Sequence, residues 1–212
     1  KSALTTELEE EATLPAKSLG VWLLQGNFVL LVAIGILNNL IALGVSSWLP
    51  TYFSVRWNVD YEDLNWLVMA PYAFNIVGLV LWAMLGDRLN FRAGFAAIGS
   101  LLAAIALFLA FNAQSLNTAI SCFCFGVFAI ASFAACEFSL VQRVIPAQHY
   151  AACAGAYNGA ATLVGGGLGP AVVAPLITSQ GAVSGSNAAS VLAATTVINA
   201  MLLFWIARRL RY

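Results

Sequence analysis

One acidic side chain lies inside a long apolar stretch of the sequence. Glu137 is the one ionisable residue well within such a stretch. A carboxyl group there could bind and release a proton. Its closeness to the end of the stretch favours a latch with Arg143, Arg88 or Arg92, or a purely structural role. A polar group costs free energy in hydrocarbon, so each of these roles requires a partner or a wet cavity.

Amide and phenol groups occur in pairs at three further places in the apolar stretches. The pairs are Asn38 with Asn39, Tyr72 with Asn75, and Tyr157 with Asn158. Residues three apart on a helix share a face, so Tyr72 and Asn75 are expected to point the same way. These groups could bind the hydroxyl or carboxylate oxygens of a small solute. Alternatively, the amides join helices to one another and the tyrosines fill gaps.

Six long apolar stretches carry these residues. The sequence is 61% hydrophobic and only 8% charged, far from the usage of soluble proteins. A helix needs about 20 mostly apolar residues to cross the hydrocarbon core of a bilayer. The stretches that meet this requirement are residues 27–49, 64–85, 93–111, 119–140, 151–177 and 189–207. The sequence therefore predicts an all-α integral membrane protein with six transmembrane helices.

The basic residues predict how these helices are oriented. Cytoplasmic loops retain Lys and Arg during insertion into a plasma or inner membrane. If both termini are cytoplasmic, all but one of the nine Lys and Arg residues lie on that side, and only Arg56 lies outside. Residues 1–26 then form a cytoplasmic linker ahead of a bundle at residues 27–212. Because the chain begins with Lys rather than Met, we expect that further protein could precede the linker.

Charge and cysteine content argue against several other functions. The net charge is zero, which gives no basis for binding nucleic acid. The four cysteines lie in or beside apolar stretches, as small reduced hydrophobic residues do, and Cys122 and Cys124 lack zinc-ligand spacing. We therefore expect no metal and no cofactor. A hydrolase is also not expected, because Ser184 lies near neither His149 nor Glu137.

A charged turn follows the second stretch. Residues 86–92 read Gly-Asp-Arg-Leu-Asn-Phe-Arg. An ordinary basic loop of a membrane protein is one reading of this turn. The turn also resembles the Asp-Arg-x-Gly-Arg loop between the second and third helices of each half of the major facilitator superfamily of secondary transporters. Asn90 stands where the family has Gly, and Asn tolerates left-handed backbone. The resemblance implies a gate role for Asp87, Arg88 and Arg92.

The fifth stretch is rich in glycine and supports the same resemblance. Small residues recur there at three- and four-residue spacing, which suits close helix packing. They include Gly155, Gly159, Gly166 and Gly169. The run at residues 155–170 is similar to the eleventh helix of the superfamily. Residues 48–53, Trp-Leu-Pro-Thr-Tyr-Phe, are similar to the end of the seventh helix in its anion:cation symporter branch, which carries organic anions such as sugar acids.

The resemblance implies the C-terminal half of a twelve-helix transporter, built as a 3+3 inverted repeat. In the family the first helix of this half lines a cavity and the second and fifth act as gates. The three polar pairs are thereby assigned to a substrate site, and Glu137 to coupling or gating. The implied substrate is a small organic anion, moved with a proton or another cation. Since the spans contain no basic residue, the charge that anchors the anion would lie in an N-terminal half missing from this chain.

A second hypothesis is a membrane assembly subunit, or a remnant of a carrier, that no longer transports. Such a protein would only pack against other membrane proteins. Six further spans encoded upstream would favour the transporter, and a start codon at the linker would favour the subunit.

Overall fold

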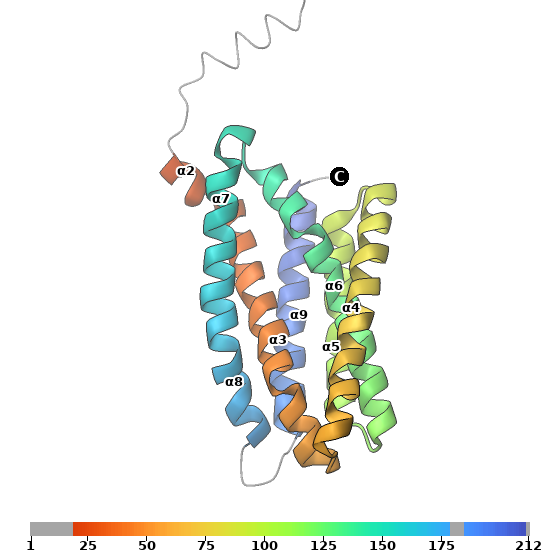
Figure 1. Ribbon diagram of the computed structural model, residues 1–212. Coiled ribbons are helices and arrows are strands. Elements are labelled where there is room, and N and C mark those ends of the chain that lie inside the picture. Colours follow the sequence, from red (N-terminus) through yellow and green to blue (C-terminus); the bar gives the residue numbers. More distant parts are fainter. Residues whose placement is uncertain (1–18, 179–184, 211–212) are drawn as a thin grey trace, which may run out of the picture.

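The computed structural model describes residues 19–178 and 185–210, and every regular element within them is a helix. Six helices are long and apolar enough to cross a membrane, as the sequence predicted (Figure 1). The elements are α2 (Leu19–Leu23), α3 (Gly26–Trp57), α4 (Tyr61–Leu89), α5 (Arg92–Phe111), α6 (Leu116–Val144), α7 (Ala147–Ala160), η1 (Ala161–Gly166), α8 (Gly167–Thr178) and α9 (Gly185–Leu210).

Several helices extend beyond the apolar stretches that predicted them. The first span does not end at Pro50, because α3 continues through it to Trp57. A proline inside a helix removes one backbone hydrogen bond and disfavours the helix, but helical winding continues on both sides of Pro50. The start of α6 is set by Ser115, whose hydroxyl accepts a hydrogen bond from the backbone N–H of Thr118 at 3.2 Å. Of the predicted linker at residues 1–26, only the part from residue 19 is described, and α2 occupies most of it.

The fifth span is composed of three consecutive helical segments, α7, η1 and α8. η1 is a π-helix, and the backbone N–H that follows it, from Gly167, donates to the carbonyl of Thr162 five residues back. Pro170 and Pro175 lie inside α8. Pro170 cannot donate to the carbonyl of Gly166, the last residue of η1. Such wide turns are rare in proteins, and many of those that occur lie at functional sites.

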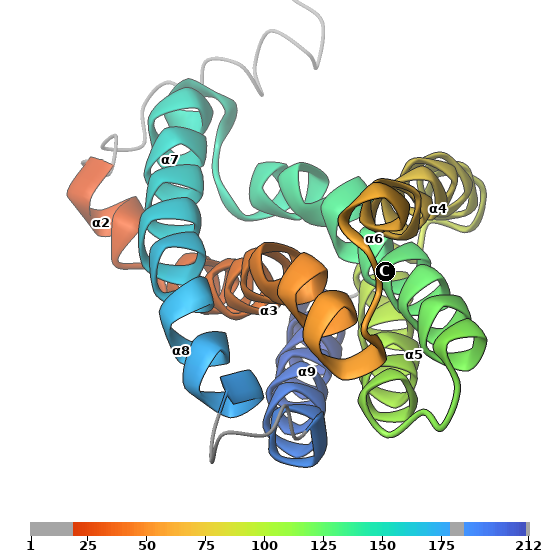
Figure 2. The same cartoon turned by 60° about the horizontal axis from the view of Figure 1, so that its bottom comes forward.

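Four helices form an inner bundle, and two spans flank it on opposite sides. The inner helices are α3, α5, α6 and α9; α4 packs along α6, and η1 and α8 pack along α3 (Figure 2). Span two therefore packs on span four, and span five packs on span one. This exchange of neighbours is what an inverted repeat of three helices produces.

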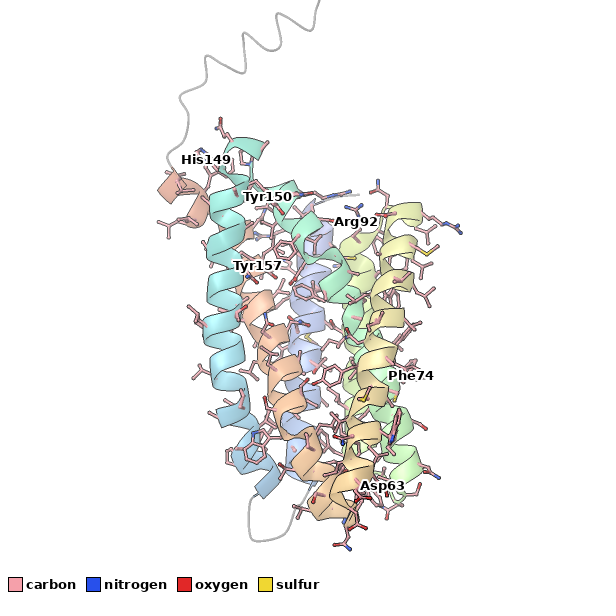
Figure 3. The ribbon with its side chains drawn as sticks, in the orientation of Figure 1. Asp63, Phe74, Arg92, His149, Tyr150 and Tyr157 are labelled. Carbon is pink, nitrogen blue, oxygen red and sulfur yellow. The ribbon has the colours of Figure 1, made fainter. Side chains whose placement is uncertain are left out.

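One end of the bundle, which we call the basic end, gathers most of the arginines. It carries Arg88, Arg92, Arg143, Arg208 and Arg209. Figure 3 labels Arg92 at this end and Asp63 at the opposite, far end.

Among the described residues, the interior contains two apolar clusters, one toward each end. The basic-end cluster includes Ile34 and Phe133. The far-end cluster includes Tyr52, Phe111 and Phe123. These three rings meet edge to face, with centroids 5.1 Å apart for Tyr52 and Phe111 and 5.3 Å apart for Phe111 and Phe123. Such contacts add to the stabilisation from burial alone, so each end of the bundle has a well-packed core of its own.

Candidate functional site

A cavity of about 130 Å³ lies between α3, α4 and α6. Its polar side chains are Ser46, Tyr72 and Asn75. Apolar residues of the same helices, and Leu107 of α5, complete the wall. Hydroxyl, phenol and amide groups within an apolar wall are the usual features of a small-molecule site.

The two polar α4 residues of the cavity, Tyr72 and Asn75, were predicted to share a face, and the structure confirms it, since both line the same wall. The side-chain amide of Asn75 donates to the carbonyl oxygen of Val127 on α6 at 3.4 Å, which fixes its position. Tyr72 is 49% exposed. Its phenol therefore lies at the open side of the cavity, where a ligand or another protein surface can reach it.

A second polar contact lies nearer the basic end and joins α6 to α7. The hydroxyl of Tyr157 donates to Oε2 of Glu137 at 3.1 Å. Tyr157 is buried, and its ring lies against Gly35 of α3, where an added Cβ would meet the phenol oxygen at 2.7 Å. Figure 3 places Tyr157 on the side of α7 that faces the bundle. The sequence assigned these two residues to separate roles, whereas the structure brings them together.

The first span connects these two places through a column of small or polar residues. Gly35, Asn38, Ala42 and Ser46 follow one another along α3 at helical spacing. Asn38 is 8% exposed, and its Oδ1 atom has no hydrogen-bond partner in the protein. Asn39 differs, because its amide donates to the carbonyl of Gly35 in its own helix at 3.2 Å.

Asn158 lies apart from both polar places. Its side chain is exposed, whereas the neighbouring Tyr157 is buried. Consecutive helical residues point in different directions, so the two cannot serve one internal site. Asn158 is not among the residues that line the cavity. Its predicted contact with substrate stays a prediction.

The charged turn at the basic end joins three helices. Asp87 and Arg92 form an ion pair with 2.6 Å between their oxygen and nitrogen atoms. Asn90 ends α4 with φ of 50°, the left-handed conformation that the sequence predicted for it. Its Oδ1 accepts a hydrogen bond from Arg143 of α6 at 2.8 Å, a link that the sequence did not reveal. Arg88 is exposed.

The predicted glycine face divides into two parts. Gly166 and Gly169 contact α3, and a Cβ on Gly169 would lie 2.7 Å from a backbone carbonyl oxygen of that helix. Gly165, which was not predicted as a packing residue, lies against another carbonyl of α3. Gly155 and Gly159 have no neighbour within 4 Å of an added Cβ. Of the four glycines predicted to pack, only the two in the later part of the fifth span therefore make close helix contacts.

Two motifs that the sequence treated separately are in direct contact. The indole N–H of Trp48, near the end of α3, donates to the carbonyl oxygen of Pro170 on α8 at 2.9 Å. This bond lies beside the glycine contacts. The Trp-Leu-Pro string thus helps to hold the fifth span, a role that spacing alone could not show.

Within residues 19–178 and 185–210, no group of three or more His, Cys, Asp or Glu side chains is placed to hold a metal ion. All four cysteines are free thiols.

The count and order of the spans, their swapped packing and the charged turn after the second span agree with one family of membrane proteins. The sequence profile of the Major Facilitator Superfamily matches residues 3–170, well over half of the chain. The chain belongs to the major facilitator superfamily. No curated protein matches it in sequence. Members of this superfamily are membrane transporters rather than enzymes, so the polar cavity and the Glu137–Tyr157 contact belong to a transporter that binds small molecules.

Proposed function

We propose that the chain is half of a secondary active transporter that moves a small organic anion by alternating access, together with a proton or another cation. The observation that carries this proposal is the cavity between α3, α4 and α6, with its three neutral hydrogen-bonding side chains. Rocking of this bundle against a second half would expose such a cavity first to one side of the membrane and then to the other.

The size of the cavity supports a shared site. Its volume of about 130 Å³ is below the roughly 300 Å³ at which small-molecule sites begin. A second half would therefore complete the wall. Exposed Tyr72 and Asn158, and the open positions of Gly155 and Gly159, are the surfaces that we assign to that contact.

The choice of a sugar acid or another carboxylate rests on the groups that are available. Hydroxyl and amide groups such as those of Ser46 and Asn75 suit the hydroxyls of a sugar. A carboxylate also needs a cation, and the lining residues include no Lys or Arg. We assign that cation to the N-terminal half. The Trp-Leu-Pro-Thr-Tyr-Phe string at residues 48–53 is the sequence feature that favours this branch.

Glu137 is the proposed coupling residue, with Tyr157 as its partner. As a carboxylate, Glu137 accepts the phenol hydrogen across the contact between α6 and α7. Once protonated, it no longer offers a charged acceptor, and the bond weakens because charge-assisted hydrogen bonds are the stronger kind. Proton binding would thus loosen α7 from α6.

We further propose that the basic end faces the cytoplasm. The arginines at that end, against the acidic loop that contains Asp60 at the far end, support this orientation.

The test is uptake of radiolabelled glucuronate by the complete carrier in proteoliposomes, with and without an inward proton gradient. We expect gradient-dependent uptake that Asn75→Leu abolishes and that Glu137→Gln uncouples from the gradient. Thr195→Val is the matched control, since Thr195 bonds only to its own helix through the carbonyl of Val191 at 2.8 Å.

The outcomes separate the proposal from its alternative. Unchanged uptake in the Asn75→Leu carrier would remove the cavity from the transport path. A folded carrier that takes up neither glucuronate nor a panel of other carboxylates would instead favour a membrane assembly subunit that does not transport.

A further inference from the structure

Five polar side chains are buried in the described part of the bundle, away from the cavity wall and from the Glu137–Tyr157 contact. They are Asn38, Ser100, Ser132, Thr196 and Asn199. All but Asn38, which is 8% exposed, have no exposed surface at all. One comes from each of α3, α5 and α6, and two come from α9. Every helix of the inner bundle therefore contributes at least one of them.

These residues occupy a single level of the bundle. On each inner helix they lie between a residue of the basic-end cluster and a residue of the far-end cluster. The flanking residues are Ile34 and Ile41 on α3, Ala97 and Ala103 on α5, Ala129 and Phe133 on α6, and Leu192 and Leu203 on α9. The two apolar clusters are thus separated by a polar level that crosses the whole inner bundle.

Most polar atoms at this level have no partner within the protein. Both amide atoms of Asn199 lack a hydrogen bond, as do the hydroxyl oxygens of Ser100 and Ser132 and the Oδ1 atom of Asn38. Exchanging the two atoms of the Asn199 amide would not change this result, because neither is paired. Only Thr196 is satisfied, by the carbonyl of Leu192 at 2.7 Å.

Such a set of buried polar atoms requires a ligand. A buried donor or acceptor without a partner costs free energy, and in native proteins these groups are almost always paired with protein or water. The ligand must accept a hydrogen bond from the Asn199 amide and donate to the oxygens of Asn38, Ser100 and Ser132. Water does both, whereas a metal cation cannot accept from an N–H group.

We propose that ordered water molecules occupy the polar level of the inner bundle, at Asn38, Ser100, Ser132 and Asn199. Gly99 of α5 lets α6 approach closely beside this level, since a Cβ there would overlap the hydroxyl of Ser132. Asn38 lies at the rim of the level, on the same face of α3 as the residues that line the cavity. The water layer therefore extends from the α3 wall of the cavity into the interior, between two dry cores.

This water layer lets the basic-end cluster and the far-end cluster shift relative to each other. Water can exchange one hydrogen bond for another, whereas interlocked apolar side chains must be unpacked to move. The inference depends on the buried polar atoms and not on the identity of the transported solute.

X-ray hydroxyl-radical footprinting of the complete carrier in lipid nanodiscs tests the proposal. Radicals that form from bound water oxidise the side chains beside it. Phe133 and Leu203 flank the polar level, and Phe53 and Phe123 lie in the far-end cluster; all four are fully buried. We expect Phe133 and Leu203 to be oxidised severalfold faster than Phe53 and Phe123. The double variant Ser100→Ala and Asn199→Leu should lower that rate to the level of Phe123 without loss of folded protein.

Two results would overturn the proposal. One is oxidation of Phe133 and Leu203 in the unaltered carrier no faster than that of Phe123, a readout that needs no variant to fold. The other is protection of these side chains when sodium replaces potassium in the buffer, because that would indicate a bound cation in place of water.

Discussion

The two flanking spans of the bundle are held in similar ways but at opposite ends. α4 approaches α6 at Gly78, where a Cβ would lie 2.6 Å from the carbonyl oxygen of Phe128. One turn further on, the indole N–H of Trp82 donates to the same carbonyl at 3.0 Å. The fifth span approaches α3 at Gly165 of η1 and Gly169 of α8, and there too an indole donates to a backbone carbonyl. Each flanking span is thus clamped by glycine and tryptophan.

The position of each clamp follows from the inverted repeat. Both clamps lie in the C-terminal half of their span, and the two spans run in opposite directions. The clamp of α4 therefore lies toward the basic end, and the clamp of the fifth span toward the far end. The remaining half of each span has no such clamp, and we call it the loosely held half. An irregularity lies near the boundary: Pro71 in α4 and η1 in the fifth span.

The two halves of the repeat therefore share a way of holding the flanking span, but they do not use equivalent residues for it. In the clamp of α4 the tryptophan belongs to the flanking span, whereas in the other clamp Trp48 belongs to the inner helix. A carrier with alternating access needs one span that can open at each end. We infer that the loosely held halves supply those movements.

Disruption of the tighter clamp should have the largest effect. Gly165→Leu would place a side chain against the backbone of α3, and we expect a loss of about 3 kcal/mol in the free energy of unfolding, measured by SDS titration. Gly155→Leu is the matched control, because nothing lies within 4 Å of that position. Equal destabilisation by the two variants would remove the distinction between the clamped and the loosely held half.

The contact that holds the loose half of the fifth span should come next. Tyr157→Phe leaves Glu137 without its phenol donor, which should cost about 2 kcal/mol, the usual value for a hydrogen bond to a charged group. A double-mutant cycle with Glu137→Gln isolates this term. Additive losses would show that the bond contributes nothing.

The two indole bonds offer a direct comparison of the clamps. Trp48→Phe and Trp82→Phe each remove one hydrogen bond to a carbonyl, and each should cost about 1 kcal/mol of unfolding free energy. We expect the first to increase proteolysis at the far end of α8 and the second to increase it at the basic end of α4. Cleavage at the same place in both variants would contradict the opposite placement of the clamps.

The smallest effect is expected at the charged turn. Asp87→Asn removes an exposed ion pair with Arg92, worth no more than about 1 kcal/mol and screened by salt. The unfolding free energy of the unaltered protein should therefore approach that of the variant as ionic strength rises. A large loss that salt does not reduce would mean that the turn holds α4 more firmly than its geometry indicates.

Much of this architecture could be predicted from the sequence, because hydrophobic length and charge placement determine how many helices cross a bilayer. The left-handed backbone of Asn90 could also be predicted, because Asn is one of the few residues besides glycine that adopt it. The shared face of Tyr72 and Asn75 could be predicted from their three-residue spacing. These features depend on local spacing.

The contacts between distant residues could not be predicted in this way. Nothing in the spacing pairs Glu137 with Tyr157, or Trp48 with Pro170, because those contacts depend on which helices become neighbours. The glycine pattern also misled in detail. Gly159 and Gly166 are seven residues apart and would share a face of a continuous α-helix, but π-helical winding begins between them at η1, and only Gly166 contacts α3.

The most direct test of alternating access uses a single cysteine at Asn75, at the cavity wall beside the clamp of α4, in a carrier without its native cysteines. A membrane-impermeant maleimide is applied from one side or the other in oriented proteoliposomes, with a cysteine at buried Phe53 as the control. The account predicts that position 75 reacts from both sides, and that a saturating carboxylate substrate shifts the ratio of the two rates. Reaction from one side only, with or without substrate, would contradict it.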